Sequence, residues 1–140
     1  MQEIESLFAE KSLRLTDPRR KLYAALKESN SPLTIAQLIK KCPGIDRTSV
    51  YRTLDLFESL GIASSTHIAW KKVYELSSPY KPHHHHFHCE VCGSFEDIES
   101  ELFEGLIEEM AQKNGFRATS HMFEVKGICR NCHTDSAHVV

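Results

Sequence analysis

Four of the five cysteines form two pairs, each with two residues between its members. The pairs are Cys89/Cys92 and Cys129/Cys132. This spacing is typical of a zinc knuckle, and four thiolates make a common closed zinc site. Two disulfides would use the same residues, but the odd cysteine, Cys42, and the lack of a secretory signal favour a reducing compartment. We therefore predict a structural Zn²⁺ site and a cytoplasmic location.

A run of four histidines, residues 83–86, precedes the first cysteine pair. Side chains along an extended strand alternate between its two faces. His84 and His86 would then point to one side, and His83 and His85 to the other. Imidazole binds Zn²⁺, Fe²⁺ and Ni²⁺ among other divalent ions. An affinity tag is the alternative, but tags lie at termini and this run is internal. We predict that the run contributes to two metal sites.

Further ligands come from elements that must lie near the histidines. A helix near residues 100–113 is expected to bury Phe103, Leu106, Ile107 and Met110 and to leave its glutamates on another face. A strand at 118–126 would carry His121 near its middle. The predicted second metal site consists of His83, His85, Glu104 and His121. The predicted regulatory site, which joins the two halves of the chain, consists of His67, Glu75, His84 and His86.

The net charge of −2 is the sum of two unlike halves. Residues 1–76 carry 12 Lys/Arg and 9 Asp/Glu, and residues 77–140 carry 5 and 10. The basic front half permits contact with an anionic polymer, whereas the acidic rear half disfavours it. No apolar stretch approaches the roughly 20 residues that cross a bilayer, so we expect no membrane partner.

The front half is expected to contain helices followed by a hairpin. Asp17-Pro18 is a helix start, with Asp17 as a candidate cap. Thr34 and Gln37 fit a capping box that opens a second helix. A third helix begins near Asp46 and ends at Gly61. Two short strands, 62–67 and 72–76, flank a turn that carries Trp70 and Lys71. This order predicts a winged helix-turn-helix.

One face of the third helix has the chemistry of a nucleic-acid contact. Val50, Leu54 and Phe57 recur at helical spacing and should pack inward, which turns hydroxyl, aromatic and Arg side chains outward. Such groups suit phosphates and base edges in a major groove. The candidate DNA contacts are Arg19, Thr48, Ser49, Tyr51 and Arg52. A winged helix used only for protein contacts is the alternative.

Five segments, taken in order, carry a family resemblance. They are Leu15–Arg19, Thr48–Leu54, Val73–Leu76, His83–Gly93 and Gly127–Cys132. With these segments the chain resembles the ferric uptake regulator family, and the resemblance covers nearly its whole length. It implies an α+β homodimer that binds double-stranded operator DNA and represses metal-uptake genes when loaded with divalent metal. The implied parts are an N-terminal winged-helix DNA-binding domain (1–76), a hinge (77–83), a small C-terminal α/β dimerisation and metal-binding domain (84–134) and a tail (135–140).

The resemblance also implies roles for the candidate ligands. It places structural zinc on the four paired cysteines, and the second and regulatory sites on the sets proposed above. Asp97 matches a position that supplies a carboxylate ligand in some members.

Three departures bear on the sensed metal. Pro32 replaces a histidine that iron and peroxide sensors use, and the segment 77–82 lacks the hinge cysteine that zinc sensors often have. Four histidines stand where iron sensors commonly have an Asp among them. We therefore favour Zn²⁺ over Fe²⁺, Mn²⁺ or Ni²⁺ at the regulatory site. A peroxide-responsive regulator with an Fe site is the alternative function, and a protein adaptor is another. We expect no enzyme, because no His-Glu-x-x-His helix or nucleophile is present.

Overall fold

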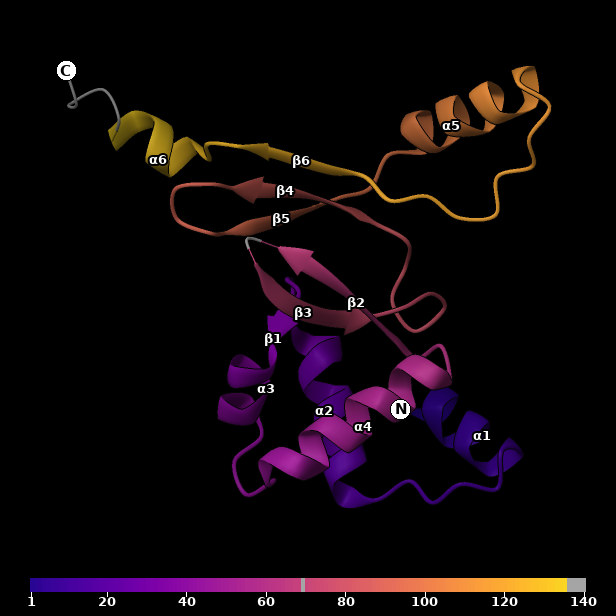
Figure 1. The fold of residues 1–140 in the computed structure, drawn as a ribbon, viewed down its shortest axis with the longest axis vertical. Coiled ribbons are helices and arrows are strands. Elements are labelled where there is room, and N and C mark those ends of the chain that lie inside the picture. The colour runs from indigo at the N-terminus through magenta and orange to yellow at the C-terminus, as the bar shows by residue number, and fades with distance from the viewer. Residues whose placement is uncertain (69, 136–140) are drawn as a thin grey trace. The chain divides into compact units, whose positions relative to one another are not determined.

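The computed structural model describes residues 1–68 and 70–135, and the chain divides into two compact units (Figure 1). The first unit spans residues 1–83, and the second begins at His84. Among the described residues, no helix combines the length and the apolar character that crossing a membrane requires.

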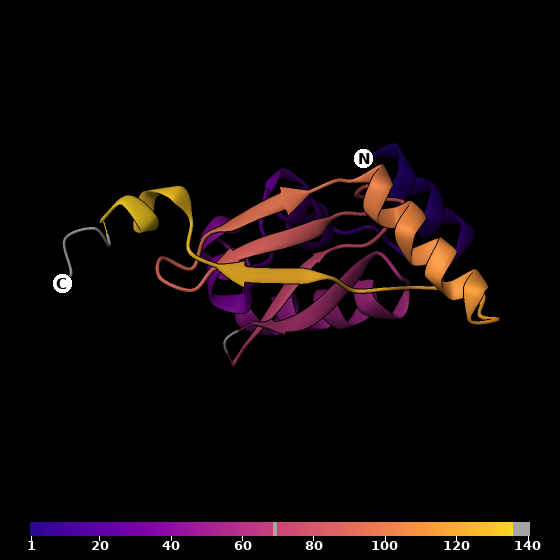
Figure 2. The same cartoon turned by 90° about the horizontal axis from the view of Figure 1, so that it is seen from above.

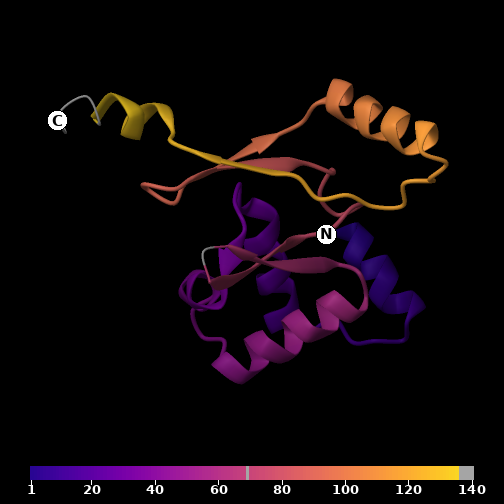
Figure 3. The ribbon, with the colours of Figure 1, turned by 45° about the horizontal axis from the view of Figure 1, so that its top comes forward.

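The first unit combines helices with a small antiparallel sheet. Its elements are α1 (Gln2–Glu10), α2 (Asp17–Glu28), β1 (Leu33–Thr34), α3 (Ile35–Lys41), α4 (Arg47–Ser59), β2 (Ala63–Ile68) and β3 (Lys71–Leu76). The strands are ordered β1-β3-β2. The α3 and α4 helices pack against each other, and the β2–β3 hairpin follows them (Figure 3). This arrangement confirms the predicted winged helix.

Helix starts in the first unit follow local capping chemistry. The capping box is confirmed, because the Gln37 amide donates to the Thr34 hydroxyl at 3.2 Å and the Thr34 amide donates to the Gln37 side chain at 2.8 Å. At the start of α4, the Ser49 amide donates to the Asp46 carboxylate at 2.9 Å. The prediction that Asp17 caps α2 is wrong. Thr16 is the N-cap, and Asp17 is the first helical residue.

The core of the first unit lies between its helices and the sheet. Val50, Leu54 and Phe57 on α4 are fully buried, as their spacing predicted. The Phe57 ring meets the Phe8 ring edge to face, with 6.4 Å between centroids. This core holds α4 by one side and leaves its opposite face in solvent.

Part of the predicted hinge is packed on the first unit. The Tyr80 ring meets the Tyr23 ring edge to face, 6.2 Å between centroids, and lies against the core. The Ser77 amide donates to the Ile62 carbonyl at 2.9 Å. The assignment of 77–83 as a hinge stays a prediction. Residues 136–140 of the predicted tail lie outside the described residues.

The second unit is built around β4, its central strand. Its elements are β4 (His85–Cys89), β5 (Phe95–Ile98), α5 (Glu101–Lys113), β6 (Glu124–Gly127) and α6 (Arg130–Asp135). The sheet order is β5-β4-β6, with β5 antiparallel and β6 parallel to β4. Each side chain of β4 therefore has neighbours from both edges of the sheet.

The predicted burial of α5 is wrong. Leu106 is 50% exposed and Met110 57% exposed, and no described residue of α5 is buried. Only the first turn of the helix meets the strand side, where the Phe103 and Phe123 rings lie 4.2 Å apart. The remainder of α5 extends beyond the end of the sheet (Figure 2). Helical spacing identified an apolar face, but no residue within the described ranges 1–68 and 70–135 buries it.

The predicted strand at 118–126 is also corrected. Regular pairing covers only Glu124–Gly127, so His121 lies before β6 and not at the middle of a strand. The physical reason is the short neighbouring strand. β4 begins at His85, and β6 pairs with it only from His86 to Cys89. Residues without a neighbouring strand have no ladder to join.

Candidate metal centres and DNA-binding surface

The four paired cysteines meet at one end of the second unit. Cys89 ends β4 and Cys92 lies in the following turn, whereas Cys129 and Cys132 follow β6. The parallel register places Cys89 opposite Gly127, which brings the second pair to the first. The four sulfur atoms all lie within 4.8 Å of one another. Cys92 Sγ and Cys129 Sγ are 3.8 Å apart, far longer than a disulfide bond of about 2.05 Å.

Hydrogen bonds already favour thiolates in this group. Backbone amide donors, first that of Cys92 and then that of Cys129, lower the pKa of Cys89 to about 6. The Cys129 amide lies 3.3 Å from the Cys89 sulfur. In contrast, the neighbouring sulfur of Cys129 is the main cause that raises the pKa of Cys132 to about 12. Four thiolates need a cation to coexist, so this donor set fits Zn²⁺.

Ser94 is a supporting residue that the sequence reasoning missed. Its hydroxyl lies 3.1 Å from Cys92 Sγ, and hydrogen bonds from Ser94 are the main cause that lowers the pKa of Cys92. The available signal was its place two residues after Cys92, within the reach of a tight turn. Partners of this kind orient the ligands of a metal site.

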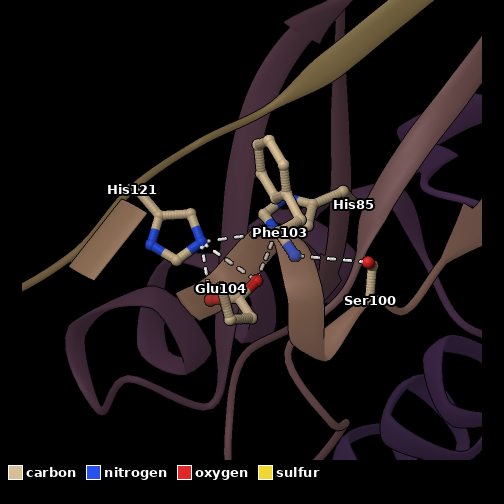
Figure 4. Close-up of polar contacts among 5 residues, drawn as sticks. All are labelled: His85, Ser100, Phe103, Glu104 and His121. Carbon is tan, nitrogen blue, oxygen red and sulfur yellow. Dashed lines mark hydrogen bonds and ion pairs between the residues drawn. The ribbon is translucent and has the colours of Figure 1, made fainter. Parts of the chain in front are cut away.

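A second group lies where α5 begins (Figure 4). Nε2 of His85 is 2.7 Å from a Glu104 oxygen, and Nε2 of His121 is 3.2 Å from the same oxygen. The two imidazole nitrogens are 3.3 Å apart. His85 is only 3% exposed, and its ring meets those of Phe103 and Phe123. These three side chains thus place two imidazole nitrogens and a carboxylate close enough together to bind one metal ion.

The capping of α5 places Glu104 in this group. The Phe103 amide donates to the Ser100 hydroxyl at 3.3 Å, which fixes the first helical turn (Figure 4). His121 arrives from the segment before β6. His83, the remaining predicted ligand, is the last residue of the first unit and stays a prediction.

The other histidine pair lies on the opposite face of β4. The rings of His84 and His86 are 4.8 Å apart between centroids, at 88°. Cross-strand pairing places Asp97 of β5 beside His86, and their Nε2 and Oδ1 atoms are 3.3 Å apart. Within the second unit, the regulatory candidate His86 therefore has Asp97 as a carboxylate neighbour.

The predicted grouping of His67 with Glu75 is corrected. His67 of β2 pairs with Lys72, whereas Glu75 of β3 pairs with Ser64. Because paired residues share a face and successive residues alternate, His67 and Glu75 point to opposite faces of the hairpin. The two residues therefore do not converge on one point of the hairpin.

His88 shares the face of His84 and His86 but belongs to neither group. It is buried and stacked on Phe95, with ring centroids 4.5 Å apart. Its Nδ1 is 3.6 Å from a Glu124 oxygen, which is too long for a hydrogen bond. Its stacking on Phe95 gives it a packing role in the sheet.

The candidate DNA contacts divide into exposed and engaged residues. Thr48, Tyr51 and Arg52 lie in solvent on the outer face of α4, and Tyr51 is 43% exposed. The Ser49 hydroxyl donates to Asp46 at 2.6 Å, so it serves the helix cap. Arg19 donates to the Arg14 carbonyl, and its guanidinium lies 5.7 Å from the centre of the Phe8 ring. The outer face of α4 is therefore the part of the predicted surface that is open to a partner.

Solved structures share this fold. The ferric uptake regulator (Fur) of Vibrio cholerae matches with a TM-score of 0.71 and 28% identity, covering 87% of this chain and 96% of that one. The Helicobacter pylori regulator Fur matches with a TM-score of 0.77 at 21% identity, covering 94% and 90%. A zinc uptake regulator complexed with zinc and DNA matches with a TM-score of 0.65 at 23% identity, covering 97% and 94%. The last two similarities concern the fold alone.

Sequence relatives and a family match agree with the fold. The ferric uptake regulation protein of Campylobacter upsaliensis is 32% identical over 141 aligned positions, which cover 95% of this chain and 88% of that protein. That of Legionella pneumophila is 30% identical over 138 positions, covering 94% and 99%. Residues 10–126 match the sequence model of the Ferric uptake regulator family. The chain therefore belongs to the ferric uptake regulator family of metal-responsive transcriptional regulators.

Proposed function

We propose that this chain is a repressor of metal-uptake genes that binds operator DNA when a regulatory divalent ion is bound. The observation that carries the proposal is the alternation of histidines along β4. His85 meets Glu104 and His121 on one side, and His86 meets His84 and Asp97 on the other. One strand thus supplies two separate nitrogen and oxygen sites, apart from the sulfur site at its end.

The three ligand groups have different tasks. The four cysteines hold a structural Zn²⁺, because a closed thiolate site binds tightly and offers no open position. His84 and His86, together with Asp97 and with Glu75 from the first unit, form the regulatory site. His83, His85, Glu104 and His121 form the second site. Imidazole-rich sites of this kind suit Zn²⁺, which we favour over Fe²⁺, Mn²⁺ and Ni²⁺.

Regulation follows from ligands on both sides of the domain boundary. Glu75 belongs to the winged helix, whereas His84 and His86 belong to the second unit. An ion held by both would favour one separation of the two winged helices in a dimer, namely the one that fits successive major grooves. A shift from a rare to a dominant DNA-competent state needs about 5.5 kcal/mol of differential metal affinity.

A second copy of the chain is the proposed partner of α5. Leu102, Leu106 and Met110 recur every four residues along the helix, and all three are exposed. An apolar stripe of this kind is stabilised when a partner covers it. The free cysteines fit a reducing cytoplasm. We propose a cytoplasmic homodimer with no catalytic step.

The test is DNA binding titrated with buffered metal. Wild-type protein first selects a duplex from a random library in Zn²⁺, and fluorescence anisotropy then measures affinity for that duplex. Metal should raise the wild-type affinity by roughly 100-fold. The double variant His84→Ala/His86→Ala should lose this dependence, because two of the four regulatory ligands are gone. Elemental analysis should still find the structural zinc.

The control is His67→Ala, which removes an imidazole from the first unit that does not converge with Glu75. It should keep the full metal response. An undiminished metal response in His84→Ala/His86→Ala would contradict the regulatory site, and failure of wild-type protein to bind any duplex would contradict the repressor. Parallel titrations with Zn²⁺, Fe²⁺, Mn²⁺ and Ni²⁺ would identify the sensed metal.

A further inference from the structure

The segment that leads from β3 to the second unit begins with a turn that is tied to the first unit. The Ser77 amide donates to the Ile62 carbonyl at 2.9 Å, which extends the contacts of the hairpin beyond β3. The amides of Tyr80 and Lys81 both donate to the Ser77 carbonyl, at 2.9 and 3.2 Å. Residues 77–81 therefore form one hydrogen-bonded turn on the first unit.

Tyr80 attaches this turn to the core of the first unit. Its ring meets the Tyr23 ring edge to face, with 6.2 Å between the ring centroids, and packs against the buried cluster. Ser78 and Pro79 of the same turn are exposed. Burial, together with the neighbouring Tyr23, raises the pKa of the Tyr80 phenol. Tyr80 is therefore the large side chain of the turn that is anchored on the first unit.

Tyr23 provides a fixed surface for this contact. Its side chain is 0% exposed, and the Lys27 ammonium lies 5.6 Å from the centre of its ring. Within residues 1–68 and 70–135, the Tyr23 hydroxyl has no hydrogen-bond partner. Edge-to-face rings attract each other through their π-systems without a hydrogen bond. The contact of Tyr80 with Tyr23 thus depends on ring packing, and a phenylalanine at either position retains it.

The anchored ring limits the length of chain that can move between the two units. With Tyr80 docked, at most residues 81–83 connect the anchored ring to His84, where the second unit begins. With Tyr80 released, the connection grows to residues 78–83, which is twice as long, because Ser77 stays bonded to Ile62. The effective concentration of one tethered group at another falls roughly as the −3/2 power of tether length, so this doubling lowers it about threefold.

We propose that Tyr80 is a positioning residue of the regulatory metal site, and that its docking on Tyr23 sets the metal concentration at which the site fills. Glu75 precedes the anchored turn, whereas His84 and His86 follow it in the second unit. A short connection keeps the ligands of both units near one another and raises the affinity of the site for its ion. This inference rests on the proposed function, because it concerns the same regulatory site.

The first test measures the anchor itself, in protein that carries zinc on its cysteines and no regulatory ion. NMR measures the rate at which the Tyr80 and Lys81 amides exchange with water. Both amides should exchange slowly in the wild type, because they donate to the Ser77 carbonyl. The Lys81 amide should exchange faster in Tyr80→Ala and as in the wild type in Tyr80→Phe and Tyr23→Phe. Equal exchange in Tyr80→Ala and the wild type would overturn the inference.

The second test measures metal affinity through DNA binding. The free Zn²⁺ concentration that gives half-maximal anisotropy with the selected duplex should rise about threefold in Tyr80→Ala. Tyr80→Phe retains the ring and should match the wild type. DNA affinity at saturating Zn²⁺ should be unchanged in both variants, because the filled site no longer depends on the tether. A loss of DNA affinity at saturating Zn²⁺ in Tyr80→Ala would show that Tyr80 supports the DNA-binding fold instead, and would overturn the inference.

A matched control lengthens the connection and leaves Tyr80 in place. Insertion of Gly-Ser-Gly between Lys81 and Pro82 makes the connection of the docked protein as long as the released one in Tyr80→Ala. The insertion should therefore raise the half-maximal Zn²⁺ concentration about threefold, and the insertion combined with Tyr80→Ala should raise it about fivefold. An insertion without effect would overturn the inference, because the tether would then not set the affinity.

The outcomes separate this inference from the function on which it rests. A wild-type midpoint in Tyr80→Ala, with the metal response lost in His84→Ala/His86→Ala, would overturn the role of Tyr80 and leave the repressor intact. An undiminished metal response in His84→Ala/His86→Ala would overturn both, because Tyr80 acts only through that site.

Discussion

The two units of this chain are stabilised in different ways. The first buries large side chains from several helices and the sheet, including Phe8, Tyr23 and Phe57. In the described part of the second unit, the buried residues are His85, His88 and Cys89. Two of these three are candidate metal ligands. The first unit is therefore held by a hydrophobic core, and the proposed metal and second copy of the chain would supply the stability that the second unit lacks.

Loss of the four-cysteine site should change the relative stability of the two units more than any other substitution. Cys129→Ser is expected to abolish zinc binding and unfold the second unit, because the small unit has little apolar core to replace the ion. The first unit should keep its own transition. Two-dimensional NMR spectra, with zinc content measured in parallel, would show loss of dispersed signals from residues after His84 only. Cys42→Ser, outside the zinc group, is the matched control and should keep the ion.

Acid should also release zinc from the four-cysteine site of the wild-type protein. The pKa of Cys89 is lowered to about 6 by the Cys92 and Cys129 amides, so its thiolate is present above that value and is lost as pH falls through it. This pKa is that of the metal-free thiol, so below about pH 6 protons compete with Zn²⁺ for Cys89, and zinc retention is favoured at neutral pH and declines in acid. A chromophoric zinc indicator, followed from about pH 8 to about pH 5, would detect the release. Full retention at the acid end would contradict this prediction.

Phe57→Ala is expected to destabilise the first unit by about 3 to 5 kcal/mol, because it leaves a cavity against Phe8. Denaturant unfolding followed by the circular dichroism of the helices would measure the change. The matched substitution in the second unit is Phe116→Ala, whose side chain is exposed. It should change stability by less than about 0.5 kcal/mol. Equal effects in the two units would contradict the contrast between them.

Leu106→Glu tests whether the second unit relies on another copy. A charge on the apolar face of α5 should weaken the dimer by roughly 100-fold and leave the monomer folded. Sedimentation velocity over a range of concentrations would measure the dissociation. Gln112→Glu adds the same charge on another face of α5 and should leave the dimer unchanged. A dimer equally stable in both variants would place the contact elsewhere.

The smallest expected effect comes from a helix cap. Thr34→Ala removes the hydroxyl that accepts from the Gln37 amide, and it should cost about 1 kcal/mol of stability in the first unit. Thr34→Ser keeps the oxygen and should restore most of that loss. Thermal melting of the two variants would measure the difference, and equal melting temperatures would show that the cap adds little here.

Short-range patterns were predicted well from the sequence. The Thr34 capping box, the Asp46 cap and the inward spacing of Val50, Leu54 and Phe57 all depend on residues within two helical turns of one another. The spacing within each cysteine pair is likewise a local feature. Only the approach of the two pairs to each other depends on distant parts of the chain. For such features, the residues that decide the structure are neighbours along the chain.

The errors arose where the deciding partner is distant or absent from the chain. Leu106 and Met110 have the spacing of buried residues, yet the described part of the second unit leaves both of them exposed. His121 was assigned to a strand, but β4 is too short to pair with that segment. His67 was grouped with Glu75, and only the register of the β2–β3 hairpin separates them.

The amino-acid sequence by itself determined the ligand types, their division into two faces along residues 83–86, and the helices of the DNA-binding domain. These follow from spacing and capping, which act over a few residues. Only the tertiary structure decided that Asp97 lies beside His86, that Glu104 and His121 meet at His85, and that Trp70 stands in solvent. Such contacts depend on strand register and on the packing of distant segments, and no local rule of side-chain periodicity contains them.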